Sequence, residues 1–317
     1  MTTLKITPEQ EKEVKALGFL RNRGTDNFNG RIITVNGKIT AAQQRCVAEA
    51  AKKFGNGDVL FTTRLTIEIP GIPYDKIEEF RAYIAKEGLE TGGTGSKVRP
   101  IVSCKATTCQ YGLIDGYALS EKIHEKFYVG YRNVKLPHKF KIGVGGCPNN
   151  CIKPDLNDLG VIGQMVPIFD EELCNGCKKC TVVDICPIDA AKVVEGVLSI
   201  DKELCNNCGR CIGKCHFDAI EEGKSGYKIT IGGRWGKRTN KGLALNKIFI
   251  DEEEVMSTIE KMILIYREQG ITGERLADTI ARIGFANIKA QLLSEEVLER
   301  KQEILEANLH LTGGATC

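Results

Sequence analysis

The chain has 317 residues and lacks any long hydrophobic run. No stretch approaches the roughly 18 consecutive apolar residues of a membrane-spanning helix, so we expect no span. Neither sign of charge dominates, since the chain has 44 Lys and Arg and 41 Asp and Glu, which gives a net charge of +3. This balance argues against nucleic acid or a membrane surface as a partner.

Targeting and nucleotide-binding signals are missing as well. The start of the chain, Met1–Lys5, lacks the apolar segment of a secretory signal, so we expect a cytoplasmic protein with reduced thiols. The Gly-rich stretch at residues 91–96 is not followed by the Lys-Ser/Thr pair of a phosphate-binding loop. No Rossmann fingerprint or flavin site is evident.

Cysteine, by contrast, is abundant, and eight of the 14 cysteines fall between residues 174 and 215. They form two near-repeats of the type CxxCxxC, each followed by a fourth cysteine. Such triplets place several thiolates around one iron–sulfur cluster, and the fourth cysteine typically serves the other cluster. We therefore assign one [4Fe–4S] cluster to a first set, Cys174, Cys177, Cys180 and Cys215, and another to a second set, Cys205, Cys208, Cys211 and Cys186.

Zinc knuckles and a disulfide framework are the alternatives for this segment. Zinc sites usually appear as two CxxC pairs rather than as CxxCxxC, which favours the cluster interpretation. The five residues between Cys180 and Cys186 exceed the usual three, which implies a small bulge before that ligand.

Four further cysteines form a third set, Cys104, Cys109, Cys147 and Cys151. Both pairs follow expected strands, at residues 98–102 and 140–144, and strand ends are the usual place for sites in α/β architecture. Two clusters side by side would form an electron relay, and a relay needs an end point. We expect a third iron–sulfur cluster at these four cysteines as that end point. Cys46 falls on the apolar side of an expected helix and should lie in the core, whereas Cys317 has no expected role.

The rest of the chain mixes strands and helices, which predicts an α+β fold. We expect strands at 31–35, 59–63 and 65–69 and helices at 41–54, 74–87, 112–126, 251–269, 274–283 and 294–309. The cysteine-rich segment 169–224 lies between expected strands at 159–168 and 226–233, so we predict that it is an insertion into a host domain. The predicted divisions are 1–75, 76–168, 169–224 and 225–317.

The third set carries a family resemblance. Cys104-x4-Cys109 together with Gly145-Gly-Cys-Pro-Asn-Asn-Cys151 resembles the siroheme sulfite and nitrite reductases over nearly the whole chain. The short form with an inserted two-cluster ferredoxin domain is most similar to the catalytic subunit of the anaerobic sulfite reductases. The resemblance implies a ferredoxin-like half domain at 1–75, one siroheme and three [4Fe–4S] clusters. Cys151 would join the third cluster to the siroheme iron.

The resemblance also implies roles for basic residues. Two arginines and two lysines would bind the substrate anion, namely Arg31, Arg99, Lys139 and Lys141. The alternation Lys139-Phe140-Lys141 would put both ammonium groups on one face of a strand. The implied siroheme contacts are Thr63, Arg64, Asn150, Arg234 and Cys151.

The implied reaction is the six-electron reduction of sulfite to hydrogen sulfide. Electrons would enter at the ferredoxin clusters from an iron–sulfur or flavin/NADH-type subunit or from a free ferredoxin. Reduction of nitrite to ammonia and a non-catalytic electron-carrier role remain alternatives. Longer members of the family resemble two tandem copies of the host unit, one with the cations and one with the cysteines. We therefore expect a homodimer with two sites, each shared between the subunits.

Overall fold

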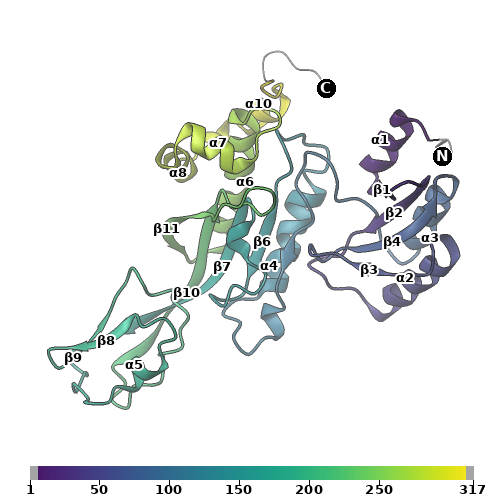
Figure 1. Cartoon of the computed structure of the whole chain (residues 1–317). Coiled ribbons are helices and arrows are strands. Elements are labelled where there is room, and N and C mark those ends of the chain that lie inside the picture. The colour runs from purple at the N-terminus through teal and green to yellow at the C-terminus, as the bar shows by residue number, and fades with distance from the viewer. Residues whose placement is uncertain (1–5, 312–317) are drawn as a thin grey trace. The chain divides into compact units, whose positions relative to one another are not determined.

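The computed structural model describes residues 6–311, so Cys317 lies outside the described part of the chain. The chain forms two compact units. The first consists of residues 1–103, 118–142 and 259–317, and the second of residues 104–117 and 143–258. Figure 1 labels their helices and strands.

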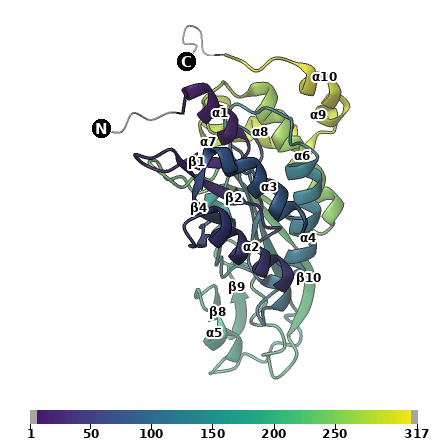
Figure 2. The same ribbon diagram turned by 90° about the vertical axis from the view of Figure 1, so that its right-hand side faces the viewer.

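The first unit begins with an antiparallel sheet in the order β1-β2-β4-β3. Its strands are β1 (Phe19–Arg21), β2 (Asn27–Ile32), β3 (Leu60–Phe61) and β4 (Ile67–Pro73). Helix α1 (Pro8–Ala16) precedes the sheet, and α2 (Ala41–Phe54) and α3 (Ile77–Ala85) cover one of its faces (Figures 1 and 2). The prediction for α2 was correct at both ends, because the Thr40 side chain caps its start and Gly55 ends it.

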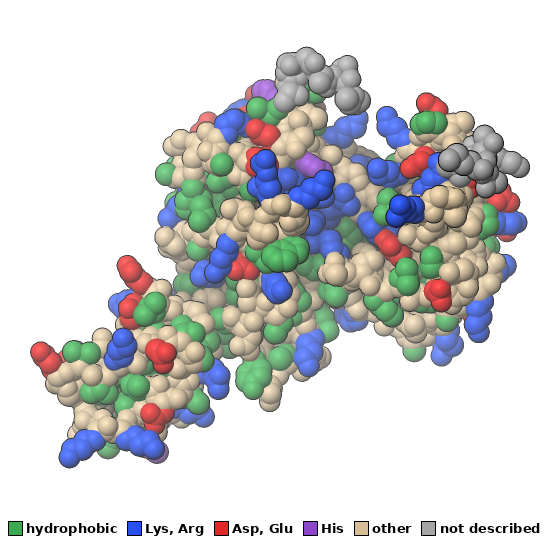
Figure 3. Space-filling model, in the orientation of Figure 1, with side chains coloured by type: hydrophobic (Ala, Val, Ile, Leu, Met, Phe, Trp, Pro, Cys, Tyr) green, Lys and Arg blue, Asp and Glu red, His purple; other side chains and the backbone are tan. Residues whose placement is uncertain are grey.

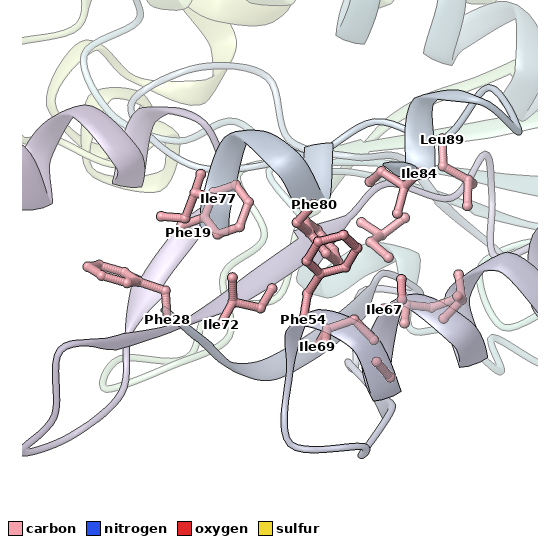
Figure 4. Close-up of a cluster of buried hydrophobic side chains, with 14 of the residues drawn as sticks. Phe19, Phe28, Phe54, Ile67, Ile69, Ile72, Ile77, Phe80, Ile84 and Leu89 are labelled. Carbon is pink, nitrogen blue, oxygen red and sulfur yellow. The ribbon is translucent and has the colours of Figure 1, made fainter. Parts of the chain in front are cut away.

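Between this sheet and the helices lies an apolar core (Figure 4). Phe80 of α3 is fully buried and makes edge-to-face contacts with Phe19 and Phe54, with ring centroids 5.9 Å apart in both pairs. Ile32, Ile67, Ile69 and Ile72 of β2 and β4 complete the contact surface. Cys46 is buried here, as expected from its position on the apolar side of α2.

The prediction for β2 was wrong in position. We expected residues 31–35, but the strand ends at Ile32 and begins at Asn27. Asn36 and Gly37 have positive φ angles in a turn closed by a bridge between Val35 and Lys38, so the chain cannot stay extended there. Arg31 therefore lies near the end of β2, directly opposite Glu68 of β4.

The other helices are α4 (Gly116–Ile123), which continues as a π-helix (His124–Val129), and α6 (Glu252–Gln269), α7 (Leu276–Ile283), α8 (Phe285–Leu293), α9 (Glu296–Glu299) and α10 (Lys301–Glu306). The expected helix at 294–309 is thus two short helices, and α8 was missed. In the first unit, the buried carboxylate of Glu260 lies 2.8 Å from Lys126 Nζ and 2.6 Å from Lys301 Nζ, and accepts a hydrogen bond from the Tyr131 hydroxyl at 2.6 Å. These contacts tie α6 to α10 and to the π-helix.

A second sheet has the order β11-β10-β7-β6-β5. Its strands are β5 (Val102–Ser103), β6 (Ile142–Gly145), β7 (Leu159–Phe169), β10 (Ile220–Ile231) and β11 (Leu243–Phe249). Strands β7 and β10 are antiparallel and pair from Leu159–Ile231 to Phe169–Ile220. The expected strand at 159–168 is therefore present as β7, whereas β10 begins earlier than expected.

The cysteine-rich segment connects the paired ends of β7 and β10. Asp170 N donates a hydrogen bond to Ala219 O at 3.0 Å, so the segment leaves and rejoins the sheet at one place. It contains α5 (Thr181–Ile185) and a hairpin of β8 (Ala191–Val194) and β9 (Val197–Ile200). Figure 1 shows these elements beyond the ends of β7 and β10. In the described residues, no helix is long and apolar enough to cross a membrane.

Candidate iron–sulfur and anion-binding site

The third cysteine set lies on loops of the second unit that follow β5 and β6. Cys104 N donates to Val144 O at 3.1 Å, and Gly146 N donates to the Cys104 sulfur, also at 3.1 Å. The loop after Cys109 is held by a bond of 2.9 Å from Leu113 N to Gly146 O. These bonds bring together the two cysteine pairs, which are distant in the sequence.

Close packing at Gly146 explains why the loop contains glycine there. A Cβ atom on Gly146 would lie 2.1 Å from Ala106 Cβ and 3.5 Å from the Cys104 sulfur. Real Cβ atoms essentially never approach another atom so closely, so only glycine fits without movement of the loop. The two loops are thus in direct backbone contact beside the thiols.

Neighbouring thiols of the third set change the pKa of Cys147. Burial raises the pKa of Cys147, and the neighbouring Cys104, Cys151 and Cys109 raise it further. Cys151 is the exposed member of the set, whereas the other three are half-buried. Cys151 is therefore the most accessible residue of the set.

Beside Cys151, the chain makes two successive turns. Asn150 and Lys153 both have positive φ angles, and Lys153 N donates to Asn150 O at 2.8 Å. The Asn150 side chain donates to Asp155 Oδ1 at 2.9 Å, while its own buried Oδ1 has no hydrogen-bond partner among the described residues. Lys153 Nζ lies 5.9 Å from the ring centroid of Trp235, an exposed side chain.

The second cysteine set lines one cavity in the inserted segment. Cys186, Cys205, Cys208 and Cys211 are all among its lining residues, which are otherwise mostly apolar. Burial raises the pKa of Cys211 to about 11, despite a backbone hydrogen bond that lowers it, and the other three cysteines add to the rise. The structure thus brings Cys186 to the triplet to which its spacing assigned it.

Cysteines of the first set lie around the small core of the same segment. Cys174, Cys180 and Cys215 pack against this core, which consists of Val182, Ala191, Leu198 and Ile220, and so do Cys186 and Cys211 of the second set. Leu198 N donates to the Cys174 sulfur at 3.4 Å. Cys177, the fourth member of the set, is half-buried.

A pocket of about 210 Å³ joins the second set to the third. Cys147 and Cys208 both line it, together with Gln110, Tyr111, Leu113, Pro148, Asn149, Gly209 and Arg210. The Cys208 loop is fixed to β7, because Met165 N donates to Asn207 O at 2.8 Å. Among the described residues, no cysteine of the first set lines this pocket, so the second set is the neighbour of the third.

The spacing of the cysteines is typical of iron–sulfur clusters rather than of single ions. In the described part of the chain, all 13 cysteines are free thiols. Within the same residues, no group of three or more His, Cys, Asp or Glu side chains could hold one metal ion. In a [4Fe–4S] cluster each thiolate binds a different iron atom, so the sulfurs lie farther apart than around one zinc ion.

The four basic residues expected to bind the substrate lie in the first unit. Arg31 donates from Nε to Glu68 Oε1 at 2.8 Å and from Nη1 to Gly93 O at 3.1 Å. Arg99 Nη1 also donates to Gly93 O, so one carbonyl links the two arginines. Phe140 is fully buried and Lys139 and Lys141 are half-buried, as expected if the lysines share the opposite face of an extended segment.

His138 lies among these cations. Its Nδ1 accepts a hydrogen bond from Lys139 N at 2.8 Å. Burial lowers the pKa of His138, and Lys139, Arg275, Arg99 and Lys141 lower it further. Arg275, which precedes α7, was missed in the sequence because nothing in its local pattern distinguishes it from a surface arginine.

The expected siroheme contacts are divided between the two units. In the first unit, Thr63 is exposed and Arg64 Nη2 donates to Pro100 O at 2.8 Å, which places Arg64 next to the Arg99 segment. In the second unit, Arg234 is half-buried and its backbone pairs with Asn240 through two bonds of 2.8 Å. Cys151 and Asn150 also belong to the second unit.

Two family descriptions match the chain. Residues 94–302 match the "Nitrite and sulphite reductase 4Fe-4S domain", and residues 21–87 match the "Nitrite/Sulfite reductase ferredoxin-like half domain". A curated relative is the "Coenzyme F420-dependent sulfite reductase" of Methanocaldococcus jannaschii, which is 31% identical over 78% of this chain and 39% of its own length. A subunit of the anaerobic sulfite reductase of Salmonella typhimurium is 29% identical over 47% of each chain.

The chain therefore spans less than half the length of both these relatives. Among solved structures, "Crystal structure of dissimilatory sulfite reductase I (DsrI)" has a TM-score of 0.67 and 23% identity over 84% of this chain and 69% of that one. This similarity supports the expected α+β fold.

Proposed function

Because the chain belongs to the nitrite and sulfite reductase family, we propose that it reduces sulfite to hydrogen sulfide with siroheme and iron–sulfur clusters. The observation that carries the proposal is the third cysteine set, in which three half-buried thiols and the exposed Cys151 converge on loops after two strands. Relatives named as sulfite reductases match with 29–31% identity and relatives named as nitrite reductases with 27–28%, which favours sulfite.

Three [4Fe–4S] clusters would be held by the three cysteine sets. The inserted segment would then be a two-cluster ferredoxin domain, with Cys186 completing the second set. Since Cys208 and Cys147 line the same pocket, the second set would pass electrons to the third, and the first set would receive them from a donor. The donor would be an iron–sulfur or flavin subunit, or a ferredoxin.

Siroheme, when bound, would supply an iron that holds the substrate and accepts electrons. Its eight carboxylates need cations and amides, which fits the residues near Cys151 in the second unit. Asn150 offers a buried Oδ1 that has no hydrogen-bond partner among the described residues, and Lys153 and Trp235 lie beside the same turns. Arg64 and Arg234 would bind carboxylates. Cys151 would be the iron's thiolate ligand.

The substrate anion would be bound by four basic residues, Arg31, Arg99, Lys139 and Lys141. The arginines would hold oxygens in two-point contacts, and the lysines would donate protons to the oxygens that leave as water. Sulfite needs six electrons and eight protons to give hydrogen sulfide and three waters, so proton donors around the anion are essential. Glu68 keeps Arg31 oriented through its contact of 2.7 Å with Nη2.

Cations and thiols belong to different units of the chain, so one site could draw them from one subunit or from two. We propose a homodimer in which the sites are shared. Co-expression of a Cys151→Ala chain with a Lys141→Gln chain tests this, because a shared site would regain part of its activity in the mixed dimer.

The decisive experiment is an anaerobic absorption spectrum of the purified protein, made with siroheme available, together with iron and siroheme analysis and titration with sulfite. A siroheme signature that shifts with sulfite supports the reductase, and turnover with nitrite instead would reassign the substrate. Iron–sulfur absorption alone would indicate a non-catalytic electron carrier.

A further inference from the structure

Basic side chains cluster next to the ligands of the first cysteine set. Lys178 and Lys179 lie between Cys177 and Cys180, and Lys214 and His216 lie on either side of Cys215. All four of these basic or imidazole side chains are exposed. Figure 3 shows Lys and Arg side chains at the tip of this segment, at the lower left.

Both parts of this cluster lie on the same surface. The Thr181 hydroxyl donates a hydrogen bond to Lys214 O, so the chain after Cys180 runs beside the chain before Cys215. An open pocket of about 430 Å³ lies at this junction and is lined by Thr181, Asp184, Ile185, Gly213, Lys214, Cys215 and His216. Phe217, which follows His216, is 44% exposed and adds an apolar contact point.

The basic cluster is a local feature of the inserted segment. Residues 170–219 contain nine Asp and Glu but only six Lys and Arg, so the segment as a whole is acidic. Three of these six cations, Lys178, Lys179 and Lys214, are next to cysteines of the first set. Half of the Lys and Arg residues of the segment are thus next to cysteines of the first set.

The second cysteine set is placed differently. Its Cys208 loop is bonded to β7 through Asn207, and a Cβ atom on Gly209 would lie 2.8 Å from Met165 Cγ. Cys208 also lines the pocket shared with Cys147. The second set therefore faces the rest of the second unit, whereas the first set lies beside the exposed basic side chains.

We propose that the surface formed by Lys178, Lys179, Lys214, His216 and Phe217 docks an acidic protein that carries single electrons, such as a ferredoxin. The proposal rests on the proposed function in assuming that the first set holds a [4Fe–4S] cluster. In each encounter the reduced carrier loses one electron and that cluster gains one, with no bond made or broken. Complementary charge speeds such short-lived encounters and makes them sensitive to salt.

The test is anaerobic stopped-flow reduction of the whole protein by a strongly acidic two-cluster ferredoxin, followed by iron–sulfur absorbance without sulfite. Lys214→Glu and, independently, Lys178→Glu should each lower the second-order rate constant at least about fivefold at low salt and flatten its salt dependence. Reduction by methyl viologen and the iron content should not change, which shows that the clusters are intact. Lys192→Glu is the matched control, because Lys192 is exposed on β8 of the same segment but is not adjacent to a cysteine.

Equal rates in the parent and both variants, or an equal loss in Lys192→Glu, would overturn the docking surface. A parent protein that accepts electrons from ferredoxin but does not turn over sulfite would refute the proposed reaction and leave the docking surface standing. A parent whose first set holds no cluster would refute the docking proposal together with its premise.

Discussion

Gly146→Ala should remove the third cluster and leave the other two. The added Cβ would lie 2.1 Å from Ala106 Cβ, whereas ordinary contacts begin near 3.4 Å, so one of the two loops must move by more than about 1 Å. Cluster ligands tolerate a displacement of only about 0.5 Å. Because Gly146 N also donates to the Cys104 sulfur, the displacement acts directly on a proposed ligand.

The assay is iron content and anaerobic absorption of the purified variant. We expect a loss of roughly two fifths of the iron, since about five of about 13 iron atoms would belong to this cluster and to the siroheme that depends on it. The inserted segment should keep its clusters, because the three nearest neighbours of the added Cβ belong to Ala106 and Cys104 and not to that segment.

A second-site change supplies the control. In the double variant Gly146→Ala/Ala106→Gly, the nearest neighbour of the new Cβ becomes the Cα of residue 106 at 3.0 Å, and the Cys104 sulfur follows at 3.5 Å. A shift of a few tenths of an ångström relieves the closer contact. The double variant should therefore regain most of the iron. Full iron content in the single variant, or no recovery in the double variant, would refute the packing argument.

Two further predictions concern the first unit. Burial alone would raise the pKa of Glu260, but hydrogen bonds from Lys126 and Lys301 outweigh it and lower that pKa to about 2. Glu260→Gln should therefore reduce the free energy of unfolding by about 3 kcal/mol at pH 7. Because the pKa of Glu260 is lowered in the folded state, the stability lost in Glu260→Gln should shrink as pH falls below about 4.5 toward 2. Urea unfolding of both proteins across this pH range checks the prediction. A stability difference that does not change with pH would contradict it. Lys141→Gln should weaken sulfite binding about tenfold with siroheme content unchanged, because one charged donor is lost. Spectroscopic titration measures this, with the exposed Lys135→Gln as control, and equal affinity in both variants would exclude Lys141 from the anion site.

Local patterns in the sequence were enough for several features. Helix α2 was predicted at both ends because Thr40 and Gly55 act within one turn of the helix. The spacing of the cysteines likewise grouped Cys186 with Cys205, Cys208 and Cys211, and these four line one cavity, while their role as cluster ligands stays a prediction. The cysteine motifs also indicated the family that residues 94–302 match.

Other features depended on contacts between distant segments, which no local pattern encodes. Strand β2 was misplaced because two features outside its local pattern decide where it ends. These are its pairing with β4, which sets Arg31 opposite Glu68, and the turn at Asn36. Arg275 could not be placed near His138 from the sequence, since 137 positions separate them.

The order of the cysteine sets has the same origin. The sequence alone indicated which thiols group together, because spacing limits which of them can reach one cluster. The shared pocket of Cys208 and Cys147 came only from the folded chain, because a backbone hydrogen bond across the fold fixes the Cys208 loop to β7. That contact places the second set beside the third, whereas the lysines next to the first set are exposed.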